Sequence, residues 1–215
     1  LGTFKKRLNS DADMSKEYKA AVKEKFSHGS DIAKKAFNKY VPEESVADGN
    51  YINTPVFRPS KGKIFMNYAL DLDNNRGPCA TYFHEHGHLI DWAMGDISWK
   101  EGFYKCLVDD MREYIDRIKR KNTFKSENEM YEKISGDLND MRKHSGVSDI
   151  MQGLTNGKVS GVAGHDIGYW NGQKISAEAF AHMFEAQFDE VRYKEMKKIF
   201  PESLKYFENL LREGT

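Results

Sequence analysis

The sequence has few cysteines and prolines and no long apolar run. Its 215 residues include 2 Cys and 5 Pro, too few cysteines for a disulfide framework, so we expect Cys79 and Cys106 to be free thiols. No run of about 18 apolar residues is present, and we therefore expect no membrane segment. The start LGTFKKRLNS lacks the apolar core of a signal peptide. Because position 1 is Leu rather than Met, we expect a domain taken from a longer protein. The sequence leaves open where that protein is located, and a virion-associated or secreted protein is compatible with it.

The chain also lacks a net charge. Lys plus Arg and Asp plus Glu number 33 each, which gives no indication of binding to nucleic acid or to a membrane surface. With 39% hydrophobic and 13% aromatic residues, the chain is too apolar to be disordered. Its length favours one domain. We therefore expect a single folded domain over residues 1–215, whose function is indicated only by local motifs.

Helical periodicity predominates in the first third of the chain, with one exception. Helices are predicted over 14–26 and 30–40, which form a helical hairpin within residues 1–41. Residues 42–62 are rich in Pro and Gly, so loop with short extended pieces is expected there. Residues 63–72 alternate β-forming side chains and give the best strand candidate.

The remainder is predicted to be helical around one ordered loop. Helices are expected over 98–121, 126–143, 176–189, 192–200 and 202–213. The first two are highly charged and form an insertion, residues 98–143, that either covers a cleft or docks a partner. Residues 146–172 are rich in Gly, Ser and Asn, and an ordered loop with a short helix at 148–154 is predicted. The fold class is therefore α+β and predominantly helical, with a small sheet.

A motif for metal chemistry lies in the helix predicted from Pro78 onward. His84 and His88 are four residues apart, which places both imidazoles on one helical face, close enough to bind one ion. Glu85 is rotated by about 100° from His84, where it is placed to take a proton from a metal-bound water. In a chain with 7 His, about 0.02 chance matches to this H-E-x-x-H pattern are expected. The pattern indicates Zn²⁺ bound by two histidines, with a glutamate as general base.

Neighbouring residues narrow the class of site. His86 lies on another helical face and is not expected to bind the metal. Gly87 has no side chain and is predicted to let another segment approach closely. Asp91 and Met94 stand where a metzincin requires glycine and histidine, so that class is excluded. Asp91 is either a partner that orients a ligand histidine or a polar residue on the helix surface.

A catalytic zinc ion needs a third protein ligand and one position for water. In the helix predicted over 176–189, Glu178, His182 and Glu185 are spaced i, i+4 and i+7, so they share one face. Small alanines between them permit close packing against the motif helix. The spacing favours Glu178 but leaves His182 and Glu185 open as alternatives.

Parts of the chain resemble known metallopeptidases. The segments HEHGHLID and AEAFAHMFEA resemble the catalytic domains of gluzincin peptidases of the anthrax lethal factor type. The stretch SDIMQGLTNGKVSGVAGHDIGYW and the tail IFPESLKYFENLL are similar to metallopeptidase-type domains of phage minor head proteins. Together the resemblance covers residues 63–95 and 146–213. It implies a zincin-like fold with a small sheet next to the motif helix.

The resemblance also implies roles for single residues. The resemblance implies that His84 and His88 are metal ligands and that Glu85 is the general base. Glu178 is implied as the third ligand because it opens the matching E-A-F-A. Tyr169 is similar to a tyrosine that stabilises the oxyanion in that family, although the spacing to Glu178 differs. His165 in the same loop is an alternative helper, and aromatic packing of Tyr169 and Trp170 under the loop is an equal alternative.

The function that follows is a zinc-dependent endopeptidase, which hydrolyses peptide bonds in a protein or peptide substrate with a metal-activated water. The strand at 63–72 is expected to align an extended substrate by edge pairing. Two alternatives are a phage head or virion module with a non-catalytic zinc site and a secreted toxin-like effector protease. Glu85 favours catalysis, because a structural zinc site needs no base and usually has four protein ligands.

Overall fold

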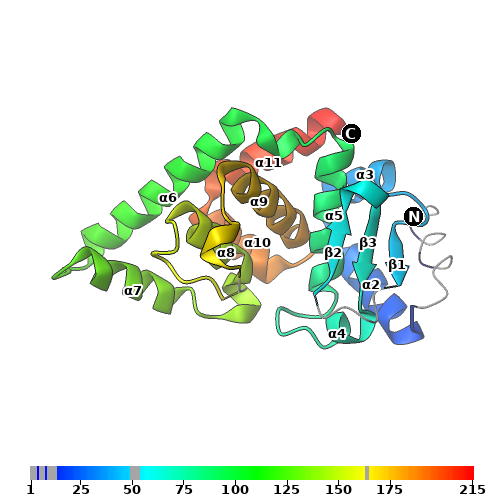
Figure 1. Ribbon diagram of the computed structural model, residues 1–215, viewed down its shortest axis with the longest axis horizontal. Helices are drawn as coiled ribbons and strands as arrows, with labels where there is room; N and C mark the ends of the chain where they lie inside the picture. Colours follow the sequence, from blue (N-terminus) through cyan, green and yellow to red (C-terminus); the bar gives the residue numbers. More distant parts are fainter. Residues whose placement is uncertain (1–3, 5–7, 9–13, 49–53, 163–164) are drawn as a thin grey trace.

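The protein is mostly helical, with one small sheet at one end (Figure 1), as the predicted fold class requires. The structure, a computed structural model, describes residues 4, 8, 14–48, 54–162 and 165–215. The predicted N-terminal hairpin is present there as α2 (Lys16–His28) and α3 (Asp31–Tyr40). Each helix begins after a serine, Ser15 or Ser30, whose hydroxyl accepts a hydrogen bond from a backbone N–H of the first turn.

The sheet has three strands in the order β1-β3-β2. The central strand, β3 (Lys63–Met66), pairs in parallel with β1 (Val46–Asp48) and antiparallel with β2 (Val56–Arg58). Both edges of β3 are therefore occupied, so the prediction that residues 63–72 pair with a substrate is wrong. The free edge of the sheet nearest to the motif helix belongs to β2.

The predicted strand over 63–72 is also too long. It ends at Met66, and the short helix α4 (Tyr68–Leu72) follows directly. The reason is local: the side chain of Asn67 accepts a hydrogen bond from the N–H of Leu70 at 3.2 Å and so caps the helix. The alternation of side chains that predicted a strand gives no information about this capping bond.

The motif helix α5 (Ala80–Ala93) lies between the sheet and α9 (Gly172–Ala186). It begins two residues after Pro78, because Cys79 adopts a positive φ of 57°. The buried Asp71 carboxylate replaces a capping residue, since it accepts hydrogen bonds from the N–H groups of Thr81 and Tyr82 at 2.9 and 3.2 Å. A negative charge at this end also complements the helix dipole.

Gly87 is the point of closest approach between α5 and α9. A Cβ atom at this position would lie 2.8 Å from the Cα of Ala181 and 3.2 Å from its carbonyl oxygen. No side chain fits into that space unless the helices move apart. The prediction that Gly87 lets another segment approach is therefore confirmed, and the small residue that meets it is Ala181.

The remaining elements follow, and most of them pack around the other sides of α9. They are η2 (Ile97–Trp99), α6 (Glu101–Lys121), α7 (Glu127–Asp137), α8 (Met141–Leu154), η3 (Ile167–Tyr169), α10 (Glu190–Ile199) and α11 (Pro201–Gly214). The α6–α7 pair projects away from the sheet (Figure 1), and no described residue of it lines the cleft at the motif. Among the described residues of the insertion over 98–143, Trp99 alone lines the cleft, so the two long helices of the insertion do not cover it.

Two helix boundaries differ from the prediction for one reason. The helix predicted over 126–143 is interrupted before Asp140, whose side chain accepts a hydrogen bond from the N–H of Lys143 at 3.0 Å and starts α8. Helix α8 then continues to Leu154, so the short helix predicted at 148–154 is confirmed, and residues 144–147, which lie between the two predicted helices, are helical as well. Glycine and serine in that stretch are buried in helix rather than exposed in a loop.

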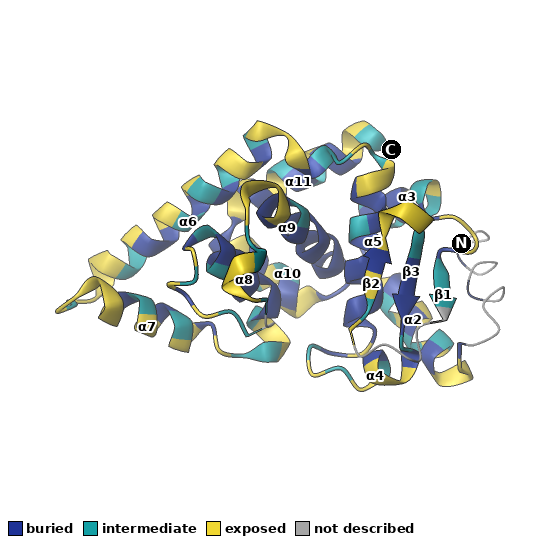
Figure 2. Cartoon of the chain, viewed as in Figure 1, coloured by how far each residue is buried: buried dark blue, intermediate teal, exposed yellow. Residues whose placement is uncertain are grey.

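The core is centred on α9, which is buried on nearly all sides, whereas α6 and α7 expose their outer faces (Figure 2). An all-round buried helix needs apolar neighbours on every side, and large aromatic side chains supply them. Fully buried examples are Phe83, Phe103, Phe180, Phe184 and Phe207. Cys79 and Cys106 are free, as predicted. Among the described residues, no helix is both long and apolar enough to cross a bilayer.

Candidate metal centre

Helix α5 brings His84 and His88 together at the edge of a cleft. Their Nε2 atoms lie 3.2 Å apart, and the side chain of His84 is 7% exposed while that of His88 is 19% exposed. This arrangement is the one that the four-residue spacing predicts. Two ring nitrogens that face each other at this distance leave room for an ion between them and the next helix.

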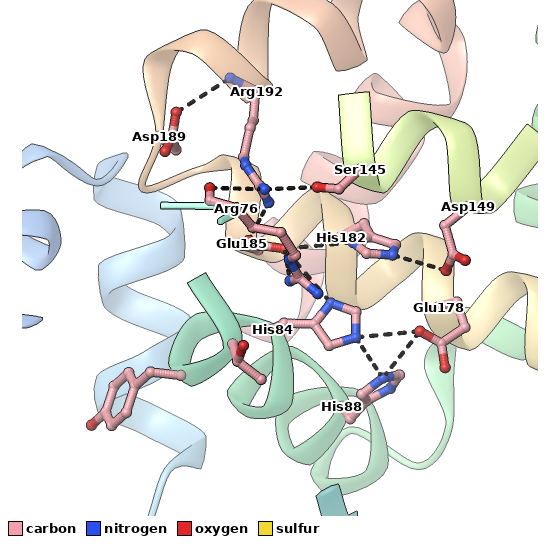
Figure 3. A network of polar contacts seen from close by, with 12 residues as sticks. Arg76, His84, His88, Ser145, Asp149, Glu178, His182, Glu185, Asp189 and Arg192 are labelled. Atoms are coloured by element: carbon pink, nitrogen blue, oxygen red, sulfur yellow. Dashed lines mark hydrogen bonds and ion pairs between the residues drawn. The ribbon is translucent and has the colours of Figure 1, made fainter. Parts of the chain in front are cut away.

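Helix α9 presents Glu178 to the same point (Figure 3). Its Oε2 atom lies 3.3 Å from Nε2 of His84 and 3.5 Å from Nε2 of His88. The helix is placed by a capping bond in which the Asn171 side chain accepts from the N–H of Lys174 at 2.9 Å. Glu178 on α9 thus faces the two histidines on α5 across the contact between these helices.

These three atoms have the spacing of a zinc ligand set. Zinc bound tetrahedrally at about 2.0–2.1 Å separates neighbouring ligand atoms by about 3.3 Å, and the three distances here are 3.2, 3.3 and 3.5 Å. The Oε2 atom of Glu178 is buried and has no hydrogen-bond donor in the described part of the chain. Two imidazoles and one carboxylate are also the donor types that zinc prefers. The residues therefore fit a zinc ion.

The electrostatics of the three groups favour a bound cation. Burial alone would raise the pKa of Glu178, but His88 and His84 outweigh it and hold that pKa well below its usual value. Burial lowers the pKa of His88, and the Glu178 carboxylate outweighs this effect and raises it. An ionised carboxylate in a buried site requires a positive partner, which a metal ion or protonated histidines supply.

The two alternative third ligands, Glu185 and His182, lie deeper and have other partners (Figure 3). Glu185 accepts from Nη2 of Arg76 at 2.9 Å and forms a second ion pair with Arg192. Its Oε2 atom is also 3.7 Å from Nδ1 of His84. A metal ion held by His84, His182 and Glu185 would sit beside two guanidinium groups and be repelled by them.

His182 is oriented by Asp149, a residue that the sequence reasoning did not identify. Its Nε2 atom lies 3.1 Å from Oδ2 of Asp149, which is fully buried. The same carboxylate lies 3.0 Å from Nδ1 of His165. The only sequence signal was a single acidic residue between the apolar residues of SGVSDIMQGL. Arg76 and Arg192 were also missed, and spacing gives no indication of either.

Glu85 belongs to the same helix as the two histidines and lines the same cleft, on the side that faces the sheet. Its Oε2 atom accepts a hydrogen bond from the N–H of Phe57 in β2 at 2.7 Å. Burial raises the pKa of this carboxyl above its usual value, although His88 and His84 act in the opposite direction. The sheet thus fixes the carboxylate predicted to be the general base.

Tyr169 and His165 also reach this point. The hydroxyl of Tyr169 donates to Oε1 of Glu178 at 2.6 Å, and its ring stacks on that of His165 with centroids 4.3 Å apart. Nε2 of His165 lies 3.9 Å from the same Oε1 atom. Burial, followed by the charge of Glu178, raises the pKa of Tyr169. The phenol therefore stays protonated and is able to donate a hydrogen bond.

Two other residues of the motif helix lie outside the candidate ligand set: Asp91 has neither of the roles considered for it, whereas His86 lies on another face, as predicted. Asp91 binds neither histidine: its carboxylate accepts from the N–H and the hydroxyl of Ser98 at 2.8 and 2.6 Å, which ties η2 to α5. His86 faces away from the cleft, with Nδ1 2.7 Å from the carbonyl oxygen of Tyr82 and Nε2 3.0 Å from the hydroxyl of Ser45.

The cleft above these groups has a volume of about 700 Å³. One wall of the cleft is formed by β2 and the end of α5, and the other by α9 and the η3 loop. Gly164, which precedes His165 in that loop, lies outside the described residues. Comparison of the chain with protein-family models, curated protein sequences and solved structures gives no match. The resemblance to gluzincin peptidases and phage minor head domains therefore remains a prediction from the motifs.

Proposed function

We propose that this chain is a zinc-dependent peptidase of the gluzincin type. The observation that carries the proposal is the buried, donor-free Oε2 atom of Glu178 at ligand spacing from His84 and His88. Glu85 on the same cleft supports a catalytic rather than a purely structural site. A structural zinc site is usually closed by four protein ligands, whereas this ligand triad opens onto a cleft of about 700 Å³.

The protein groups divide the chemistry between them. When bound, zinc would polarise a peptide carbonyl and acidify a water molecule. Glu85 accepts the proton of that water, and its raised pKa brings it closer to the working pH than an ordinary glutamate. The N–H of Phe57 holds Oε2 of this carboxylate, so we assign the proton transfer to Oε1.

Tyr169 and His165 are the proposed donors to the oxygen on which negative charge develops. Both lie on the η3 side of the cleft, opposite Glu85, and both are within 4 Å of Oε1 of Glu178. Asp149 accepts a hydrogen bond from Nδ1–H of His165, which directs Nε2 toward the site. Nε2 donates when the ring is protonated; burial lowers the pKa of His165, but the Asp149 carboxylate outweighs this effect and raises it. Preorganised donors of this kind are often the largest single contribution to catalysis.

The proposed substrate is an extended peptide alongside β2. This strand is the edge of the sheet, and Val56 and Phe57 line the cleft. Backbone groups on an exposed edge bind extended chains by adding a strand. The N–H of Phe57 already donates to Glu85, so the peptide would pair with the carbonyl oxygen of Phe57. The alignment role predicted for residues 63–72 is therefore transferred to residues 56–58.

The test compares wild type with Glu85→Gln, both loaded with zinc, on a mixed peptide library analysed by mass spectrometry. Loss of the base is expected to lower turnover by at least about 100-fold without changing zinc content. Glu190→Gln is the matched control, because Glu190 is exposed on α10 and pairs only with Lys194 there. Equal turnover by wild type and Glu85→Gln would refute the proposal.

A further inference from the structure

Two tryptophan side chains are exposed in the cleft that contains the candidate metal centre. Trp92 is 43% exposed and Trp99 is 50% exposed, and both line the cleft. Val56, at 37% exposed, lines the same wall. Tryptophan is ordinarily largely buried because its ring carries a large apolar area. Its repeated exposure beside a single cleft indicates a surface that is covered when a ligand binds.

The position of Trp92 relative to the ligand histidines follows from the helix. His84, His88 and Trp92 are successive residues at four-residue intervals on α5. Four residues correspond to about 6 Å along the helix axis, which equals about two residues of an extended peptide. A peptide that passes the metal ligands along this wall therefore brings a side chain next to Trp92 one or two residues from the reacting bond.

The tryptophans are held in place by their neighbours. The ring of Trp92 lies 5.7 Å from the ring of Phe57 in β2, with an interplanar angle of 57°. Trp99 follows Ser98, whose N–H and hydroxyl are both bound by the buried Asp91. This bond fixes η2 against α5. A preorganised apolar surface binds a ligand without the entropic cost of ordering it.

The opposite wall of the cleft has a different character. It carries Lys174, whose ammonium group lies 4.2 Å from the centre of the Tyr169 ring, and the polar groups of His165 and Glu178. The apolar surface is thus confined to the side formed by β2, the end of α5 and η2. A peptide in the cleft would meet an apolar environment on one side only.

We propose that Trp92 and Trp99 form a binding subsite for a large apolar or aromatic side chain, and that the substrates are peptides with such a residue within two positions of the reacting bond. This inference rests on the proposed peptidase function for the identity of the ligand. The subsite itself consists of residues that neither bind the metal nor take part in proton transfer.

Peptide binding to the Glu85→Gln variant tests the subsite without turnover. The probes are acetylated hexapeptide amides that differ in one residue, Phe, Leu, Ala or Gln, at each position in turn, and binding is measured by calorimetry with and without zinc. Burial of a large apolar side chain corresponds to about 10- to 100-fold in affinity. We expect Phe and Leu peptides to bind at least about 10-fold more tightly than Ala peptides at one position.

Substitution of the tryptophans identifies the surface responsible. Trp92→Ala and Trp99→Ala, each added to Glu85→Gln, are expected to remove most of that preference. Leu70→Ala is the control, because Leu70 is 51% exposed but does not line the cleft. If Trp92→Ala fails to fold, Trp99→Ala, whose ring is half exposed, still decides the question. A preference for Phe and Leu that both tryptophan variants retain would overturn the subsite.

The same peptides, given to the protein with Glu85 intact, separate the two proposals. Glu85-dependent cleavage with no preference at any position would overturn the subsite and leave the peptidase function standing. Tryptophan-dependent binding without cleavage would overturn the peptidase function and leave an apolar peptide-binding site. Absence of both binding and cleavage would overturn both.

Discussion

Replacement of Gly87 by alanine tests whether the candidate metal centre depends on the close approach of α5 and α9. The added Cβ would lie 2.8 Å from the Cα of Ala181 and 3.2 Å from the Cβ of Phe184. Nonbonded carbon atoms are optimally separated by about 3.5–4.0 Å. Because the nearest obstacle is backbone, the helices must separate by roughly 0.7–1.2 Å to restore that distance.

Two effects on stability oppose each other. Alanine is favoured over glycine within a helix by about 1 kcal/mol, whereas overpacking a close-packed contact costs about 1–3 kcal/mol. Since the clash is with Ala181 backbone rather than with a flexible side-chain end, overpacking is expected to win. We expect a net loss of up to about 2 kcal/mol in the free energy of unfolding.

The same movement disturbs the ligand set, because Glu178 belongs to α9 and the histidines belong to α5. The distances of 3.3 and 3.5 Å from its Oε2 atom to His84 and His88 would lengthen with the helix separation. Zinc–ligand distances tolerate changes of only about 0.2 Å. Zinc affinity is therefore expected to fall by about 10- to 100-fold, as when groups that orient metal ligands are lost.

Thermal unfolding and competition with a zinc chelator measure the two effects. Gly136→Ala is the matched control, since Gly136 lies within α7 and an added Cβ would meet no described atom within 4 Å. This control is expected to gain up to about 1 kcal/mol and to bind zinc normally. If Gly87→Ala melted at or above the wild-type temperature with unchanged zinc affinity, the reasoning about the α5–α9 contact would be refuted.

Three further substitutions test other parts of the site. Glu178→Gln is expected to lower zinc affinity, measured by chelator competition, by more than about 10-fold. Glu185→Gln breaks buried ion pairs and should lower the free energy of unfolding by about 3–5 kcal/mol, measured by thermal unfolding. Equal losses of zinc affinity in the two variants would contradict the assignment of Glu178 as the ligand. Asp149→Asn removes the negative charge and one of the two acceptor oxygens that face His165 and His182, and it should lower kcat for peptides by at least about 10-fold with little change in KM. An unchanged kcat would exclude a role of Asp149 in orienting His165. Burial raises the pKa of Asp91 to about 6, so the folded state binds more protons than the unfolded state between about pH 4 and 6. As the pH rises through this range, the free energy of unfolding of the wild type should fall by about 3 kcal/mol relative to that of Asp91→Asn. A pH-independent difference in denaturant unfolding between these two proteins would refute that shift.

The part of the site that is local in sequence was predictable. His84 and His88 face one point because helical geometry alone fixes residues four apart. Gly87 was also predicted as a point of close approach, since absence of a side chain is visible in the sequence. What met Gly87 was not predictable, because Ala181 reaches it through the tertiary packing of α9.

The errors in the predicted elements have a shared cause. Periodicity indicated a strand through 63–72 and one helix over 126–143, but the side chains of Asn67 and Asp140 each accept a hydrogen bond from a backbone N–H of the following helix. One capping bond contributes about 1 kcal/mol, enough to move a boundary between states of similar stability. Because periodicity is averaged over a window, it does not locate such single bonds.

The choice among Glu178, His182 and Glu185 shows why spacing alone left the third ligand open. All three residues occupy one face of α9, so their positions in sequence are equivalent with respect to α5. The difference arises from Arg76, which is distant in sequence, and from Arg192 in the next helix; both form ion pairs with Glu185 and not with Glu178 or His182.

A buried carboxylate without a cation is strongly unfavourable. Once the two guanidinium groups neutralise Glu185, Glu178 is the acid on that face that depends on the histidines for a positive partner. The arginines thus repel a metal ion from the inner end of the α5–α9 contact and leave the outer end, next to the cleft, as the favourable place for it. On this argument the buried arginine pair selects where on α9 a metal ion binds, although neither arginine touches the candidate ligand Glu178.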